Sequence, residues 1–225
     1  MENEASKTRS LNIAFVADAH LLRRLESMLK EVDASTLEYA VKFSDGSTVK
    51  YDDIEEIIAQ PNSRRHAIVS LIAGVEGHAG RSASVTLRDS PSPSVEYTVN
   101  GRQRDVTYVA DKLDDWADAL SQWYSPFVST LQIVPVIVAI GLPLLAVNAL
   151  SAHFPANNTG LQSYIPGAGL VLVIVVEILA FKLFPRGTFA IGQGVKRHQL
   201  FNFLRYTFGA SILASVLANW ITKHL

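Results

Sequence analysis

The chain has 225 residues, of which 48% are hydrophobic, and its formal net charge is −1. It contains no cysteine, which excludes disulfide bonds and zinc sites built from cysteine. Only one of the 21 acidic residues, Glu177, follows Ser125, so the acidic charge is confined almost entirely to the first half. We therefore expect two unlike parts, a domain of typical size over residues 1–125 and an apolar part over residues 126–225.

Residues 1–125 show the periodicities of an α+β domain. Alternating apolar residues predict strands at residues 11–17, 37–43, 49–51, 66–75, 82–87 and 95–99. Helical spacing predicts helices at residues 18–32, 54–58 and 105–124. Asp18 is a candidate N-cap of the first helix, and Asp45-Gly46 predicts a β-hairpin turn. The expected fold is a mixed or antiparallel sheet of five or six strands with two or three helices.

The remainder of the chain contains three apolar runs that we expect to cross a membrane as helices. These runs are residues 128–150, 167–184 and 206–222. The third, of about seventeen residues, lies at the lower limit for crossing a hydrocarbon layer of roughly 30 Å. Residues 182–205 contain five Lys or Arg and no acid, whereas residues 151–166 contain no Lys or Arg. This asymmetry, with the absence of a signal peptide, predicts a multipass inner-membrane protein whose N-terminal domain is cytosolic.

One carboxylate, Glu177, lies inside an expected span. It is costly in hydrocarbon unless it faces protein or water, so it is a candidate pore-lining residue, or alternatively the partner in a buried hydrogen bond. Ser211, Ser215 and Asn219 repeat every four residues and either line a pore or pack helices together. Both uses require a protein neighbour, which favours a homo-oligomer.

The first expected span contains Pro135, Gly141 and Pro143. A proline weakens the helical hydrogen-bond ladder at a definite place, so these residues are candidate gating hinges. They are equally consistent with static kinks, and the sequence leaves both uses open.

Motifs of a catalytic site are absent from the sequence. It lacks a P-loop, a GxSxG motif, an HExxH motif and a dinucleotide glycine fingerprint, and its six histidines are scattered. We therefore expect no enzyme, no catalytic residues, no metal and no cofactor.

Positive charge gathers at three points of the N-terminal part. The candidate ligand-binding residues are Arg23, Arg24, Arg64, Arg65, Arg102 and Arg104. If folding brings some of them together, they would bind the phosphates of a nucleotide. The alternative is a solvated surface with interspersed charges of both signs.

Several segments are similar to a known family. The hairpin EYAVKFSDGSTVKYDDIEEI, the segment SRRHAIVSL, the helix that leads into WYSPF and the sequence FPRGTFAIGQGVKRHQ resemble the membrane effector of the Hailong type of bacterial anti-phage defence system. The resemblance implies a tetrameric, ligand-gated ion channel in the lipid bilayer of the inner membrane. It also implies that the cytosolic domain senses a nucleotide or oligonucleotide signal made by a partner nucleotidyltransferase.

Two functional hypotheses follow. The first is an anti-phage effector whose cytosolic domain senses a nucleotide and whose helical part depolarises the membrane, the two being coupled through the helix at residues 105–124. The alternative is a non-conducting membrane anchor or scaffold whose cytosolic domain recruits a protein partner.

Overall fold

The computed structural model describes residues 4–33, 37–77, 80–89, 93–126 and 184–207. In chain order the elements are β1 (Glu4–Leu11), β2 (Phe15–Asp18), α1 (Ala19–Val32), β3 (Leu37–Phe43), β4 (Thr48–Tyr51), α2 (Ile54–Ile58), β5 (Ile68–Glu76), β6 (Ser82–Arg88), β7 (Val95–Arg102), α3 (Gln103–Leu120) and β8 (Gly187–Ala190). Residues 193–207 form a further helix. Packing divides the chain into two units, Met1–Ser125 with Pro185–Leu225 and Pro126–Phe184, and almost all described residues belong to the first.

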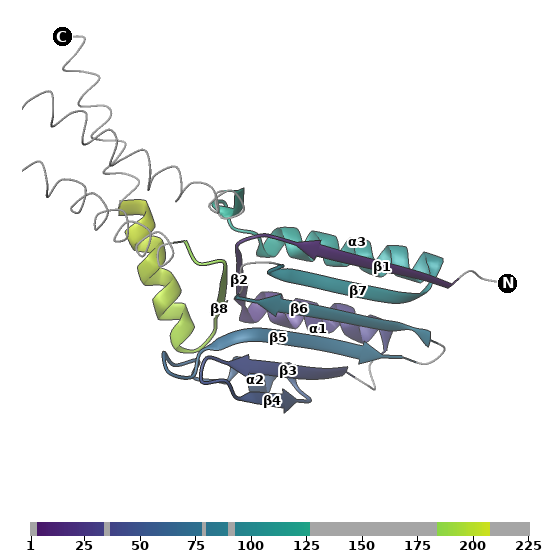
Figure 1. The fold of residues 1–225 in the computed structure, drawn as a ribbon, viewed down its shortest axis with the longest axis horizontal. Coiled ribbons are helices and arrows are strands. Elements are labelled where there is room, and N and C mark those ends of the chain that lie inside the picture. Colours follow the sequence, from purple (N-terminus) through teal and green to yellow (C-terminus); the bar gives the residue numbers. More distant parts are fainter. Residues whose placement is uncertain (1–3, 34–36, 78–79, 90–92, 127–183, 208–225) are drawn as a thin grey trace, which may run out of the picture. The chain divides into compact units, whose positions relative to one another are not determined.

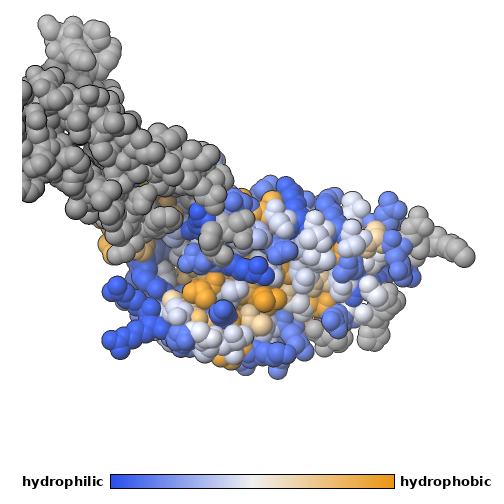
Figure 2. Space-filling view, viewed as in Figure 1, coloured by the Kyte–Doolittle hydropathy of each residue, from blue (hydrophilic) through white to orange (hydrophobic). Residues whose placement is uncertain are grey.

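Six strands form one antiparallel sheet in the order β1-β7-β6-β5-β3-β4. Helices α1 and α3 lie against one face of this sheet, and no described element covers the other face (Figure 1). Side chains alternate along each strand, so Val85 and Tyr97 are buried toward the helices while Ser84 and Thr98 lie on the open face. Figure 2 shows the open face as a mixture of hydrophilic and weakly polar surface with small apolar patches.

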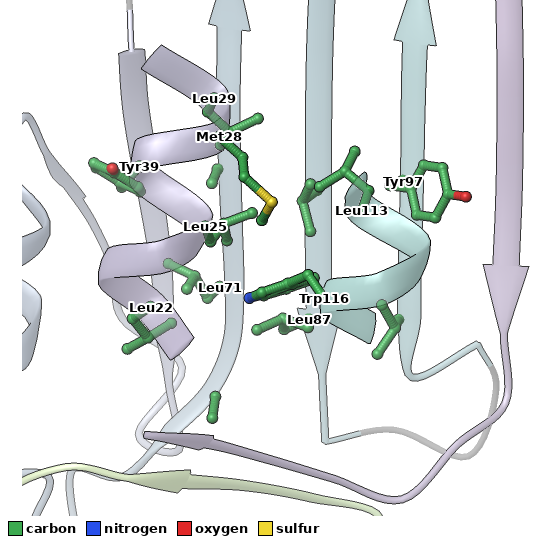
Figure 3. Packing of buried hydrophobic residues seen from close by; sticks show 14 of the residues in the cluster. Leu22, Leu25, Met28, Leu29, Tyr39, Leu71, Leu87, Tyr97, Leu113 and Trp116 are labelled. Carbon is green, nitrogen blue, oxygen red and sulfur yellow. The ribbon is translucent and has the colours of Figure 1, made fainter. Parts of the chain in front are cut away.

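The hydrophobic core lies between the sheet and the two long helices. Trp116 of α3 and Leu25 of α1 are fully buried there, close to Leu87 of β6 (Figure 3). The indole Nε1 of Trp116 donates a 2.9 Å hydrogen bond to the carbonyl of Leu21, which satisfies its only polar atom. Each large apolar side chain buried in this way contributes about 1.5–3 kcal/mol. Packing of these apolar faces is therefore what holds α1 and α3 on the sheet.

Short-range contacts explain where α1 begins and where the first hairpin turns. Asp18 Oδ1 accepts a 2.8 Å hydrogen bond from the backbone N–H of Leu21, which makes it the N-cap of α1. Asp45 Oδ1 accepts a 2.9 Å hydrogen bond from the N–H of Ser47. Gly46 between them has a φ of 89°, a conformation that costs little without a side chain. Both features lie where the sequence predicts them.

A segment from the far end of the chain completes this unit. Strand β8 pairs in parallel with β2, and Phe189 is buried in the core. The side-chain amide of Asn62 donates to the carbonyl of Phe189 at 2.8 Å, and its oxygen accepts from the N–H of Ile68 at 3.0 Å. The Arg197 guanidinium donates to the carbonyl of Asn62 at 2.7 Å. These contacts, which we call the Asn62 joint, attach β8 and the helix of residues 193–207 to the domain; the sequence predicts neither element.

Two other elements differ from the prediction. Residues 11–17 were expected as one strand, but β1 ends at Leu11 and β2 begins at Phe15, with the intervening backbone held by Ser94 and Ser125. The expected helix 105–124 ends at Leu120, where Ser121 becomes extended and its N–H bonds back to Ala117.

The expected transmembrane architecture needs correction. Among the described residues, no helix is long and apolar enough to cross a membrane. The longest two labelled helices, α1 with 14 residues and α3 with 18, carry charged side chains along one side. Three predictions are therefore wrong for this part of the chain: the α-helical transmembrane region, the multipass localisation in the inner membrane, and the ion channel. Apart from Phe184, Tyr206 and Thr207, the expected spans 128–150, 167–184 and 206–222 lie outside the described residues.

Candidate functional site

The six candidate arginines do not meet in one place. Arg102 ends β7 and Arg104 follows it in α3, at the end of the sheet where β1 begins. Arg64 and Arg65 precede β5, at the opposite end of the sheet. Because β5 has nine residues, these two ends lie about 30 Å apart. Each pair of arginines therefore belongs to a separate surface.

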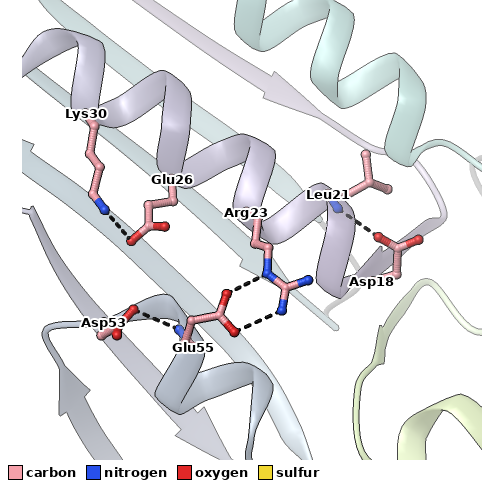
Figure 4. A network of polar contacts seen from close by, with 7 residues as sticks. All are labelled: Asp18, Leu21, Arg23, Glu26, Lys30, Asp53 and Glu55. Atoms are coloured by element: carbon pink, nitrogen blue, oxygen red, sulfur yellow. Dashed lines mark hydrogen bonds and ion pairs between the residues drawn. The ribbon is translucent and has the colours of Figure 1, made fainter.

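The remaining pair, Arg23 and Arg24, is exposed in the first turns of α1, and Arg23 is already engaged (Figure 4). Its Nε and Nη2 donate to the two carboxylate oxygens of Glu55 in α2 at 2.5 and 2.9 Å. The hydrogen bond from Arg23 lowers the pKa of Glu55 below its ordinary value. Arg23 thus connects α1 to α2. This ion pair with Glu55 explains why the position carries an arginine without any role in ligand binding.

The loop of Arg64 and Arg65 is fixed by its neighbours. The next residue, His66, stacks on Phe43 with ring centroids 3.8 Å apart, and its Nδ1 lies 2.7 Å from Asp45 Oδ2. Ser63 and His66 also form a β-bridge. Arg64 and Arg65 therefore extend from a well-held loop and are exposed to solvent.

A hollow of about 540 Å³ lies at the other end of the sheet. It is lined by Glu4, Ala5, Ser6, Gly80, Asn100, Gly101 and Arg102. Most of these side chains are small, and Gly80 and Gly101 have positive φ angles of 72° and 150°, which favour glycine. The volume falls within the range of roughly 300–1,000 Å³ that is usual for sites of small molecules. We call this site the Arg102 hollow.

A second hollow, of about 180 Å³, shares Asn100 with the first. Tyr108 of α3 lines it, and this side chain is 56% exposed. Lys112 Nζ lies 4.5 Å from the centre of the Tyr108 ring. Arg81, which also lines this hollow, forms a 3.0 Å ion pair with Asp105. An exposed aromatic ring beside a polar hollow is suited to stacking on a nucleobase.

The start of α3 lies at the Arg102 hollow, and its first turn carries one acid, Asp105, which is paired with Arg81. Arg102 is the N-cap residue of α3, and its side chain makes no capping hydrogen bond. The first N–H groups of a helix lack partners within the helix and carry a partial positive charge. Together with the guanidinium of Arg102 and the exposed Arg104, they make this end of the domain suitable for a phosphate group.

Sequence reasoning identified Arg102 and Arg104 but missed the rest of this site. The strand order and the start of α3 bring Asn100, Gly101 and Tyr108 to the two hollows, and no local sequence pattern specifies this arrangement. One signal was available, because a glycine near the end of a strand often marks close approach of a ligand or another segment. Gly101 has this position in β7.

The other sequence-based candidates cannot be placed. The candidate pore-lining and hinge residues that lie outside the described residues are Pro135, Gly141, Pro143, Glu177, Ser211, Ser215 and Asn219. Within the described ranges, no group of three or more His, Cys, Asp or Glu residues is arranged to hold a metal ion. Comparison with known proteins gives no match to a family model, to a curated protein or to a solved structure.

Proposed function

We propose that the α+β domain is a recognition module that binds a nucleotide or short oligonucleotide at the Arg102 hollow and performs no catalysis. The proposal rests on two hollows that share Asn100: Arg102, the N-cap residue of α3, lines the larger one, and the exposed Tyr108 lines the smaller one. The other two candidate pairs, Arg23 with Arg24 and Arg64 with Arg65, line neither of these two hollows.

The Arg102 hollow and the smaller hollow beside it together offer a partner for each part of a nucleotide. A phosphate would lie against Arg102 and the first N–H groups of α3, because both are positive. A base would stack on Tyr108, where base–aromatic stacking is worth about 1–3 kcal/mol. Asn100 lines both hollows; its Nδ2 donates to Ser82 Oγ at 3.0 Å, and its amide oxygen can accept from a base edge. Glu4 supplies an acceptor for a sugar hydroxyl.

Equilibrium binding tests this arrangement. The full chain would be titrated with ATP and with a trinucleotide at two salt concentrations, as the wild type and as Tyr108→Leu. We expect binding that weakens as salt rises, because phosphate contacts release counterions, and about tenfold weaker binding for Tyr108→Leu. Tyr51→Leu, in β4 and away from the hollow, is the matched control. Equal affinities of Tyr108→Leu and the wild type would contradict a base-stacking role.

A further inference from the structure

The helix formed by residues 193–207 buries several polar side chains and exposes several large apolar ones, unlike an ordinary surface helix. Polar side chains on one side are buried or half-buried, namely Arg197, His198, Asn202 and Arg205. The exposed side is mixed: polar residues such as Lys196 and Gln199 lie there beside large apolar or aromatic side chains, namely Val195, Leu200, Phe203, Leu204 and Tyr206. A surface helix normally turns its apolar side to the core and its polar side to water. The buried polar side chains of this helix therefore need partners.

Arg205 is the most deeply buried of these polar residues and carries a charge. Only 5% of the residue is exposed, and its guanidinium lies over the ring of Tyr124 at 4.6 Å. Burial raises the pKa of Tyr124, and Arg205 opposes this rise. The Nε of Arg205 donates to the carbonyl of Phe201 at 3.2 Å, but within the described part of the chain Nη1 and Nη2 are buried without a hydrogen bond of normal geometry. A buried charge without a partner is strongly unfavourable. An anion at Nη1 and Nη2 would remove this penalty.

A second polar atom on this helix, Nδ1 of His198, is also buried with no hydrogen-bond partner among the described residues. His198 lies two turns before Arg205 on the same side of the helix. Burial and the positive charge of Arg205 both lower the pKa of His198. None of the ion pairs among the described residues involves Arg205, and residues 178–225 contain no Asp or Glu. The segment of the two side chains therefore supplies no acid, although Asp89 acts electrostatically on Tyr124, the residue over whose ring Arg205 lies.

We propose that Arg205 and His198 form a binding site for a phosphate group. The planar guanidinium presents Nη1 and Nη2 as a fork that matches two oxygens of one phosphate, and the Nδ1 of His198 supplies a third contact. The phosphate has two chemical sources, a free phosphate ion and the headgroup of a phospholipid. The exposed Phe203 and Tyr206 on the same helix would contact the acyl region of a lipid. This site is independent of the Arg102 hollow, since none of its residues lines that hollow.

Thermal unfolding of the full chain tests the site with inorganic phosphate. Wild type, Arg205→Gln, Arg205→Lys and the exposed control Lys196→Gln would be compared in phosphate and in chloride at equal ionic strength. We expect phosphate to raise the midpoint of the wild type and of Lys196→Gln, but not that of Arg205→Gln. In chloride, Arg205→Gln should unfold at a higher temperature than the wild type, because it removes an unpaired buried charge. Arg205→Lys keeps the charge without the fork and should bind phosphate about tenfold more weakly.

Vesicle flotation tests the lipid source with the same proteins. Vesicles of phosphatidylcholine alone would be compared with an equimolar mixture of phosphatidylcholine and phosphatidylglycerol. Retention of the wild type and Lys196→Gln on the mixed vesicles, with loss for Arg205→Gln, would identify a headgroup phosphate. A response of the wild type to inorganic phosphate alone would identify the free ion. If neither probe distinguishes the wild type from Arg205→Gln and Arg205→Lys, the proposed site is wrong.

Discussion

The side-chain amide of Asn62 donates a 2.8 Å hydrogen bond to the carbonyl of Phe189, a residue 127 positions later in the chain. Asn62 is buried, with 1% of its surface exposed, and has a φ of 44°. Asparagine tolerates this left-handed conformation better than most residues with side chains. One residue thus combines an unusual backbone conformation with the attachment of β8 to the domain.

Replacing Asn62 with alanine should weaken this attachment. The change removes the hydrogen bonds that Asn62 makes with the carbonyl of Phe189 and the N–H of Ile68, and it places alanine in a left-handed conformation. We expect the free energy of unfolding to fall by about 2–4 kcal/mol, measured by urea denaturation of the full chain.

Asn62→Gly and Asn62→Asp separate the two causes. Glycine permits the backbone conformation but removes the hydrogen bonds, so it should recover only the backbone part of the loss. Aspartate keeps the acceptor for Ile68 but faces the carbonyl of Phe189 with an oxygen, so it should remain destabilised. A stable Asn62→Ala protein would show that the joint contributes little to folding.

Gly194 should not tolerate a side chain. A Cβ at this position would lie 2.2 Å from the carbonyl oxygen of Phe189 and 2.5 Å from Asn62 Nδ2. Gly194→Ala should therefore separate residues 193–207 from the domain and expose them to limited proteolysis. Gly74→Ala in β5 is the matched control, because a Cβ there meets nothing within 4 Å. Equal resistance of both variants to the protease would contradict this close approach.

Asp45 should make stability depend on pH at the acidic end. Hydrogen bonds from the Ser47 side chain and backbone, and then from His66, lower the pKa of Asp45 to about 2. A carboxylate with a lowered pKa stabilises the folded state above its unfolded pKa, ordinarily near 3.8, and loses this contribution as the pH falls through about 2. The wild type should therefore have a higher thermal unfolding midpoint than Asp45→Asn near pH 6, and this difference should shrink as the pH falls to 2.

Ser47→Ala provides a second measure of the same effect. It removes the hydroxyl donor that contributes most to the shift, so the pH-dependent part of the stability should shrink. A difference between the wild type and Asp45→Asn that stays constant from pH 6 to pH 2 would show that the carboxylate charge has no part in it.

Elements that depend on neighbouring residues could be predicted from the sequence. The first helix begins at its Asp18 cap, and the hairpin turns at Asp45-Gly46, because both signals act over three or four residues. Strand β1 escaped prediction because its inward positions include Lys7 and Arg9 in place of apolar residues. These side chains are paired with Asp111 and Asp114 of α3, which permits charge at those positions.

Features that depend on distant segments could not be predicted. The pairing of β8 with β2 and its fastening by Asn62 join parts of the chain that no periodicity connects. The strand order likewise places Arg64 and Arg102 at opposite ends of the sheet. The sequence therefore identified cationic residues but not which of them adjoin a hollow.

The most direct measurement is the affinity of the full chain for ATP and a trinucleotide by calorimetry, comparing Arg102→Gln with Arg64→Gln. We expect Arg102→Gln to bind at least about tenfold more weakly and Arg64→Gln to bind like the wild type, because Arg102 lines the hollow and Arg64 does not. Equal affinities for both variants, or no binding by the wild type, would contradict nucleotide recognition at this site. The latter result would favour recruitment of a protein partner, for which the outer edge of β1, unpaired among the described strands, is available.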